Sequence, residues 1–289
     1  MRYIAKDYNN PIARAQLEST SCNQDVCNSV QVSKGKYQKA KFGHKIVRDQ
    51  LRLIYHDKCC YCESSIRPVS TPHIEHFRPQ KAITEVNKKG YYWLGYEWTN
   101  LLLACPTCNG IKSTKFPILR NNHLVTHPQD INQKIDFTKF SIDSDFYKEE
   151  RPLIINPERI NPEKLFYIDY FCYLIPVKNN RLAKTTIKEI KLNRNDLVAA
   201  RQKYVNNIID DIEEQLRIKY SHPGLTDLQF KIQLEIIFKK IIVQIYPTEE
   251  YTMLGRNMIE RFDELILEDI EPAFRKEIYN LFVRFLKQI

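Results

Sequence analysis

The sequence predicts an α+β fold in which a small core of two short strands and a short helix, stapled by a structural four-cysteine metal site, precedes a mostly α-helical C-terminal region. Three observations lead to this prediction. Two Cys-x-x-Cys pairs frame short apolar runs in the first half, and apolar residues recur at helical spacing through most of residues 182–289. The net charge of +9 is uneven, because residues 1–120 carry 19 Lys and Arg against 9 Asp and Glu, whereas residues 121–289 are almost neutral.

The bulk composition is that of an ordinary globular chain. Its 289 residues, 43% hydrophobic and 27% charged, suffice for one large domain or two modest ones. No stretch approaches the apolar length of a membrane span, and the N-terminus lacks the apolar run of a signal peptide. We therefore expect a cytoplasmic protein that does not bind a membrane.

Four parts of the chain differ in pattern. They are an N-terminal arm with a basic helix (1–57), a cysteine- and histidine-rich core (58–120), a loop-rich connector with a hairpin (121–181) and a helical C-terminal region (182–289). The first 35 residues are polar and are expected to be irregular. A helix is expected from Tyr37 to Tyr55, where apolar residues recur at helical spacing.

Basic residues lie on or just before this N-terminal helix. They are Lys34, Lys36, Lys39, Lys41, Lys45, Arg48 and Arg52. A helix of this kind either follows a phosphate backbone or presents a solvated face, and the sequence leaves both interpretations open.

The second half predicts a hairpin and then helices. The hairpin is expected over Phe166–Val177 with the turn Lys178-Asn179-Asn180. Helices are expected near 195–220, 228–245 and 272–286. Their apolar stripes predict core packing and a surface for a protein partner.

The cysteine spacing predicts a structural zinc site. Cys59 and Cys62 form one Cys-x-x-Cys pair, and Cys105 and Cys108 form another. Each pair can supply half of a tetrahedral Zn²⁺ shell, and two pairs close that shell without leaving an open position. Cys60 offers an alternative register, but the spacing from Cys60 to Cys62 is wrong for such a pair. The remaining cysteines, Cys22, Cys27 and Cys172, are expected to be bystanders.

Residues around the two pairs suggest phosphodiester cleavage. That reaction needs a base to activate water and a cation to stabilise the charged phosphorane and the leaving oxygen. His76 is the candidate base, and Glu75 and Asn109 offer hard oxygen ligands that suit Mg²⁺ or Mn²⁺. Residues 72–77 and 100–104 can form two short strands, and residues 109–116 can form a helix that Pro117 ends.

The order of these residues resembles the HNH (ββα-metal) nuclease motif in its zinc-ribbon variant. An acid–His pair is followed by Asn-Leu and then by Cys-x-x-Cys-Asn-x-x-Lys. The resemblance implies that Glu75 and Asn109 ligate the catalytic metal, that His76 is the general base and that Asn100 orients this histidine. The chain departs from the motif by having Glu where Asp or His is commoner, and Asn where a final His often stands.

A more particular likeness spans most of the chain. The segments that carry it are His73–Pro79, Leu102–Asn109, Leu153–Pro157, Arg181–Ile187 and Leu192–Arg194. They resemble the PtuB-like HNH subunit of Septu and retron-associated anti-phage defence systems. The resemblance implies an effector endonuclease, a hydrolase that works in a hetero-oligomer with a PtuA-like ATPase subunit and cuts DNA. RNA, such as tRNA, is the alternative substrate, because the motif alone does not exclude it.

Other residues near the motif have candidate roles. His73 either approaches the metal or phosphate or makes a structural hydrogen bond. Arg78, Lys112 and Lys115 are candidates for phosphate contact, with a solvated surface as the alternative. Aromatic residues at 91–98 can stack on bases, although packing of a small metal domain is the favoured explanation.

Two other classes of protein share part of this pattern. A zinc nucleobase deaminase has H-x-E followed by P-C-x-x-C, which His73-Ile74-Glu75 and the Cys105 pair imitate. Ala104 stands where that motif needs Pro, and the Cys59 pair would have no role. A non-catalytic zinc-ribbon module that binds nucleic acid explains the cysteines and the charge but leaves Glu75 and His76 without a function.

Overall fold

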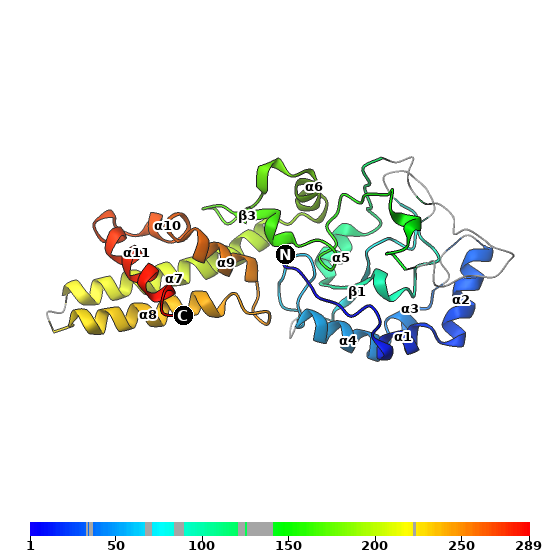
Figure 1. The fold of residues 1–289 in the computed structure, drawn as a ribbon, viewed down its shortest axis with the longest axis horizontal. Coiled ribbons are helices and arrows are strands. Elements are labelled where there is room, and N and C mark those ends of the chain that lie inside the picture. Colours follow the sequence, from blue (N-terminus) through cyan, green and yellow to red (C-terminus); the bar gives the residue numbers. More distant parts are fainter. Residues whose placement is uncertain are drawn as a thin grey trace. The chain divides into compact units, whose positions relative to one another are not determined.

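The computed structural model divides the chain into two compact units (Figure 1). It describes residues 1–32, 34, 37–66, 71–83, 90–120, 125, 141–221 and 224–289. The site unit comprises Arg2–Leu165 and Lys178–Leu192, and the helical unit comprises Met1, Phe166–Val177 and Asn193–Ile289. Taken together, the described residues are mostly helical with few short strands, which confirms the α+β class. No helix among the described residues is long and apolar enough to span a membrane.

The site unit is built around one pair of antiparallel strands. Its elements are α1 (Pro11–Leu17), α2 (Thr20–Gln31), α3 (Lys39–Phe42), α4 (Lys45–Tyr55), β1 (His73–His76), η1 (Trp98–Asn100), β2 (Leu101–Ala104), α5 (Pro106–Lys112), η4 (Asp145–Tyr147), η5 (Pro162–Lys164) and α6 (Arg181–Ile190). Strand β1 pairs with β2 so that Glu75 lies opposite Leu102. Cys105 alone separates β2 from α5, so the two strands and the helix form one continuous local unit.

Three expectations for the site unit need correction. The first 35 residues are not irregular, because α1 begins at a side-chain cap from Asn10 and buries Leu17, and α2 buries Cys22 and Val26. The basic helix is divided into α3 and α4, since the backbone leaves the helix at Gly43. Helix α5 begins at Pro106 and ends before Ser113.

Ser113, not Pro117, ends α5. The φ angle of Ser113 is +48°, which an α-helix does not accommodate. The expected helix over 109–116 is therefore shifted toward the first cysteine of its pair.

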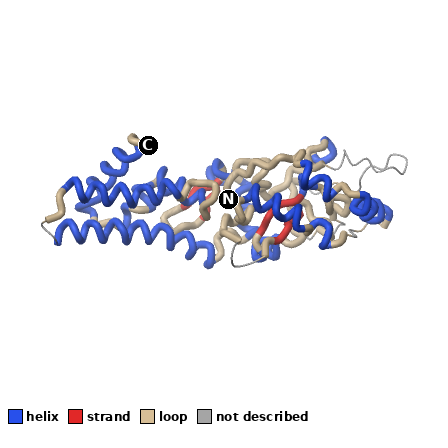
Figure 2. The backbone as a smooth tube through the Cα atoms, turned by 90° about the horizontal axis from the view of Figure 1, so that it is seen from below, coloured by secondary structure: helices blue, strands red, loops and turns tan. Residues whose placement is uncertain are grey.

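The helical unit contains the hairpin and the C-terminal helices. Its elements are β3 (Phe166–Ile168), β4 (Leu174–Pro176), α7 (Asn195–Ser221), α8 (Asp227–Val243), α9 (Thr252–Glu260), α10 (Phe262–Leu265), η7 (Leu267–Asp269) and α11 (Pro272–Leu286). Helices α7 and α8 lie side by side in both views (Figures 1 and 2). The rings of Phe262 and Phe282 stack at 3.8 Å between centroids in its core. The three predicted helices are confirmed to within two residues at each end.

The hairpin turn is not where the sequence predicted it. The turn lies within residues 169–173, where Asp169 N–H donates to the carbonyl of Tyr173 and Cys172 has a φ of +63°. Of the predicted turn, Lys178 and Asn179 belong to η6 (Val177–Asn179), and Asn180 caps α6 by accepting from the Ala183 N–H. Two asparagines in sequence indicated a turn, but the second one begins a helix.

A buried ion pair anchors the N-terminal arm to the site unit. Lys6 Nζ donates to the carbonyls of Trp98 at 2.7 Å and Leu101 at 2.6 Å, and it lies 3.4 Å from the Glu158 carboxylate. The Tyr55 hydroxyl donates to the same carboxylate. Burial lowers the pKa of Lys6 and raises the pKa of Glu158, so each charge depends on the other for compensation.

Removing one partner of this pair should destabilise the site unit. In Glu158→Gln the ammonium of Lys6 stays buried without a carboxylate, so we expect the free energy of unfolding to fall by about 3 kcal/mol. Urea denaturation followed by tryptophan fluorescence measures this loss, because both tryptophans, Trp93 and Trp98, belong to the site unit.

The control for this prediction is Asp49→Asn. It breaks the solvent-exposed pair with Lys45 on α4 and should cost less than about 1 kcal/mol. Equal losses in the two variants would contradict the structural importance of the buried pair.

Candidate active site and metal cluster

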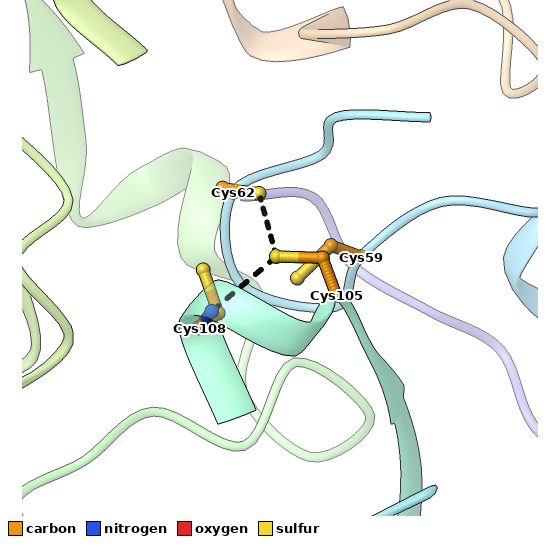
Figure 3. Close-up of side chains that lie close together, drawn as sticks. All are labelled: Cys59, Cys62, Cys105 and Cys108. Atoms are coloured by element: carbon orange, nitrogen blue, oxygen red, sulfur yellow. Dashed lines mark hydrogen bonds between the residues drawn. The ribbon is translucent and has the colours of Figure 1, made fainter. Parts of the chain in front are cut away.

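Four cysteine side chains gather beside the first turn of α5 (Figure 3). They are Cys59, Cys62, Cys105 and Cys108, and their sulfur atoms all lie within 4.8 Å of one another. Cys62 Sγ and Cys105 Sγ are 3.9 Å apart. A tetrahedral zinc shell with Zn–S bonds of about 2.3 Å has sulfur–sulfur edges of about 3.8 Å. The cluster can therefore hold a metal ion such as zinc.

Local hydrogen bonds shape both halves of this cluster. Cys105 caps α5, since its sulfur accepts from the Cys108 N–H at 3.3 Å. In the other half, Glu63 N–H donates to the Cys59 carbonyl at 3.0 Å and closes a tight turn. Cys60 is not one of the four clustered cysteines, and its backbone N–H donates to the Leu103 carbonyl of β2 at 2.8 Å. The pairing of Cys59 with Cys62, rather than a register that uses Cys60, follows from this geometry.

A cleft of about 690 Å³ opens beside the cluster, within the site unit. Residues from the α3–α4 turn, from β1 and the chain just after it, and from α5 line it. Among them are His73, Glu75, His76, Asn109, Lys39, Arg48 and Lys81. The cleft thus collects four of the predicted site residues together with three cations that the sequence did not single out as site residues.

His76 is held in one tautomer. Its Nε2 lies 2.9 Å from the carbonyl oxygen of Gly95, and because a carbonyl can only accept, Nε2 carries the proton. Nδ1 is then the unprotonated nitrogen. The ring of Phe42 packs edge-on against the imidazole, with 5.0 Å between ring centroids. Burial lowers the pKa of His76 to about 4, so the imidazole is neutral at physiological pH and can accept a proton.

Glu75 forms a buried ion pair with the last residue of α5. Its Oε1 lies 2.5 Å from Lys112 Nζ, and Lys112 also donates to the His76 carbonyl at 3.0 Å. Both side chains are almost fully inaccessible to solvent. Burial raises the pKa of Glu75, and the neighbouring ammonium opposes that rise. This pair fastens the C-terminal end of α5 to β1.

His73 contacts the other end of the same helix face. Asn109 Nδ2 donates to His73 Nδ1 at 3.0 Å. Residues two apart on a strand share a face, and residues three apart on a helix are neighbours. His73 and Glu75 therefore meet Asn109 and Lys112 in the same order along β1 and α5. His76, one residue on, points to the opposite side of the strand, toward Gly95 and Phe42.

Asn100 lies outside the cleft and is fully buried. Its Oδ1 accepts from the Arg78 N–H at 2.8 Å, and its Nδ2 donates to the carbonyls of Arg78 at 3.0 Å and Leu94 at 3.3 Å. These bonds join the chain that leaves β1 to the chain that approaches Gly95, the residue that holds His76. The amide of Asn100 is thus placed to fix the backbone around the histidine without touching it.

The three cations predicted to contact phosphate all have carboxylate partners. Arg78 Nε lies 2.8 Å from Glu150, and Lys115 Nζ lies 3.5 Å from Glu189, in addition to the Lys112 pair. Arg78 and Lys112 are buried, so the solvated surface considered as their alternative is not what the structure shows. The aromatic residues Tyr91, Trp93 and Trp98 are buried as well, and Trp93 Nε1 donates to the Tyr147 hydroxyl.

The other cysteines lie apart from the metal cluster. Cys22 and Cys27 are on α2, and Cys172 is in the hairpin turn of the helical unit. In the described part of the chain, no group of potential metal ligands includes any of them.

Comparisons with known proteins find similarity to two proteins of the same name from two Bacillus species. No family model matches the chain. The chain is similar to Septu protein PtuB of Bacillus mycoides (strain KBAB4), with 27% identity over 249 residues, which cover 81% of this chain and 77% of that protein. It is also similar to Septu protein PtuB of Bacillus thuringiensis, with 24% identity over 215 residues, which cover 73% of this chain and 67% of that protein.

The cysteine cluster predicts different outcomes for two adjacent thiols. Cys59→Ser removes one of the four sulfur ligands, so we expect the purified protein to lose its bound metal and the site unit to unfold at a lower urea concentration. Cys60→Ser is the matched control, since this neighbouring buried cysteine is outside the cluster, and it should retain one metal ion per chain. Elemental analysis of both proteins measures the metal, and equal metal content would show that the cluster is not the binding site.

Proposed function

We propose that this chain is a metal-dependent endonuclease of the HNH type, with zinc in the four-cysteine cluster. The observation that carries the proposal is the arrangement of β1, β2 and α5. One cleft contains a neutral histidine of fixed tautomer, His76, and two oxygen ligands, Glu75 and Asn109. This combination supplies the base and the cation ligands that phosphodiester hydrolysis requires.

The catalytic cation in this proposal is Mg²⁺ or Mn²⁺. Glu75 and Asn109 would hold it, and their hard oxygens suit both metals, which complete their shells with water and substrate phosphate. When bound, it would stabilise the charge that develops on the phosphorane and the leaving oxygen. Lys112 neutralises Glu75 in this structure, so the ammonium would have to release this carboxylate for a divalent cation to bind there. The released ammonium would then be available to a substrate phosphate.

In this proposal, the chain's own residues accept the proton and position the reacting groups. His76 takes the proton of the attacking water on Nδ1, because Nε2 is committed to the Gly95 carbonyl. Asn100 keeps the backbone around Gly95 and Arg78 in place. His73 orients the amide of Asn109 by accepting its N–H, which turns the amide oxygen away from the imidazole and leaves it for the cation.

A zinc nucleobase deaminase is the less favoured enzyme class. That chemistry needs a histidine and two cysteines around one zinc with an open position. In this structure Cys105 and Cys108 cluster with Cys59 and Cys62, while His73 is bonded to Asn109. A closed four-thiol site supports a structural metal rather than one that activates water.

We further propose a role in anti-phage defence. The similarity to two proteins named Septu protein PtuB supports that role. In this proposal the nuclease acts on DNA, or alternatively on RNA, in a hetero-oligomer with a PtuA-like ATPase subunit. The helical unit offers an apolar surface for such a subunit, since Leu228, Ile232 and Ile236 are exposed along one side of α8.

Replacing the proposed base tests the enzyme class. His76→Ala should lower metal-dependent cleavage by at least about 100-fold, because it removes the proton acceptor and leaves the metal ligands in place. The assay is nicking of plasmid DNA, with structured RNA in parallel, by the chain alone and together with its ATPase partner in Mg²⁺ or Mn²⁺. The zinc content and the urea midpoint of the variant should match those of the parent protein.

His56→Asn provides the matched histidine control. His56 is exposed, lies outside the cleft, and has a left-handed backbone conformation that asparagine tolerates. Its cleavage rate should equal that of the parent. Cleavage that survives in His76→Ala would exclude this histidine as the base.

A further inference from the structure

Three cations line the cleft and have no carboxylate partner in the described part of the chain. They are Lys39 of α3, Arg48 of α4 and Lys81, which follows β1. Among the described residues, none of the three forms an ion pair, whereas Lys112 and Arg78 next to the same strand are both neutralised. The uncompensated positive charge in this part of the site unit is therefore directed at the cleft.

The basic residues of α3 and α4 separate cleanly by partner. Lys41 pairs with Asp25 at 2.8 Å, Lys45 with Asp49 at 2.7 Å and Arg52 with Asp57 at 2.5 Å. None of these three lines the cleft, and Lys39 and Arg48 both do. On α3 and α4, the cations that have carboxylate partners therefore lie outside the cleft, and the two that line the cleft have no such partner among the described residues.

A hydrogen bond to the turn between α3 and α4 orients the Arg48 side chain. Arg48 Nη2 donates to the Gly43 carbonyl at 2.8 Å, which fixes the plane of the guanidinium. Its Nε is buried and has no hydrogen-bond partner within the described chain. Gly43 is needed for this turn, because a Cβ there would lie 2.6 Å from the Lys39 carbonyl oxygen. The glycine therefore lets the chain bring Lys39 and Arg48 to one wall.

We propose that Lys39 and Arg48, with Lys81, bind the phosphates of a nucleic-acid backbone that passes through the cleft. The inference rests on the proposed nuclease function and assigns its substrate-holding residues. A cleft of about 690 Å³ with cations on more than one segment suits an extended polyanion better than a single phosphate ion. Arg48 is the member placed for two-point contact with phosphate oxygens, because its fixed guanidinium still offers unpaired N–H groups.

Salt-dependent binding of the full chain tests this assignment. Fluorescent duplex DNA and single-stranded RNA are titrated with the zinc-loaded chain without added Mg²⁺ or Mn²⁺, so that the proposed cleavage does not occur, over a range of salt concentrations. Each phosphate contact contributes about 0.9 to the slope of log affinity against log salt for duplex DNA and about 0.7 for single strands. Lys39→Gln and Arg48→Gln should each lower the slope by about that amount and weaken binding several-fold at low salt. The double variant should lower the slope by about twice as much, and the polymer that binds more tightly identifies the source of the phosphates.

Variants of equal charge serve as controls. Lys45→Gln, and Lys45→Gln combined with Lys148→Gln, change the net charge by the same amounts at exposed lysines of the site unit that already have carboxylate partners. Their slopes should match that of the parent protein. Equal slopes for cleft and control variants would overturn the proposal, and so would absence of binding to both polymers.

The binding assay and the cleavage assay test the phosphate site and the nuclease function separately. If the slopes fall as expected but no cleavage occurs with any divalent cation, the phosphate site stands and the nuclease proposal fails. If the parent protein cleaves but the cleft variants bind with unchanged slopes, the nuclease proposal stands and this assignment of phosphate contacts fails.

Discussion

The four-cysteine cluster lies at the junction between β2 and α5. Cys105 follows β2 directly and caps α5, and Cys108 lies in the first turn of the helix, so a metal held by the cluster would fix the angle between strand and helix. Cys59 and Cys62 bind that corner to the chain that precedes β1. In the proposed zinc-bound state, four metal–thiolate bonds would add a rigid constraint on this angle to the packing of the buried residues around it. Asn109 follows Cys108 directly, so its place in the cleft is fixed by the same corner.

The Glu75–Lys112 pair fixes the other end of α5 and creates a conflict with metal binding. A carboxylate buried to this degree needs a positive partner, because an isolated buried charge is very costly. Lys112 meets that need in the structure, and a divalent cation would meet it equally well. In the proposed metal-bound state the two positive charges would compete for one carboxylate, and without a metal the ion pair holds that carboxylate in place against α5. The two predicted contacts would therefore be coupled, because a metal bound to Glu75 would free Lys112 to contact a phosphate.

The sequence predicted the parts of the fold that short-range spacing determines. The two Cys-x-x-Cys pairs, the strands beside them and helices α7, α8 and α11 follow from spacings of two to four residues. The prediction failed where a local pattern was ambiguous. At α2 the many polar Ser and Asn residues indicated an irregular segment, although Cys22 and Val26 form a buried helix face there. The prediction could not identify partners distant in sequence, because Glu150 lies 72 residues beyond Arg78 and nothing near either residue indicates the pair.

Charge illustrates the same limit at the site itself. The sequence located the positive excess in residues 1–120 but could not separate a phosphate-binding face from a solvated one. What separates them is the position of each carboxylate: Asp25, Asp49 and Asp57 neutralise the lysines and arginine that point away from the cleft. In the described part of the chain Lys39 and Arg48 form no ion pair, and the acidic residue that lines the same cleft, Glu75, is already neutralised by Lys112. The unpaired cations at the cleft are therefore a local source of positive potential, and in the proposed function this potential would attract a polyanion toward His76 rather than to the surface as a whole.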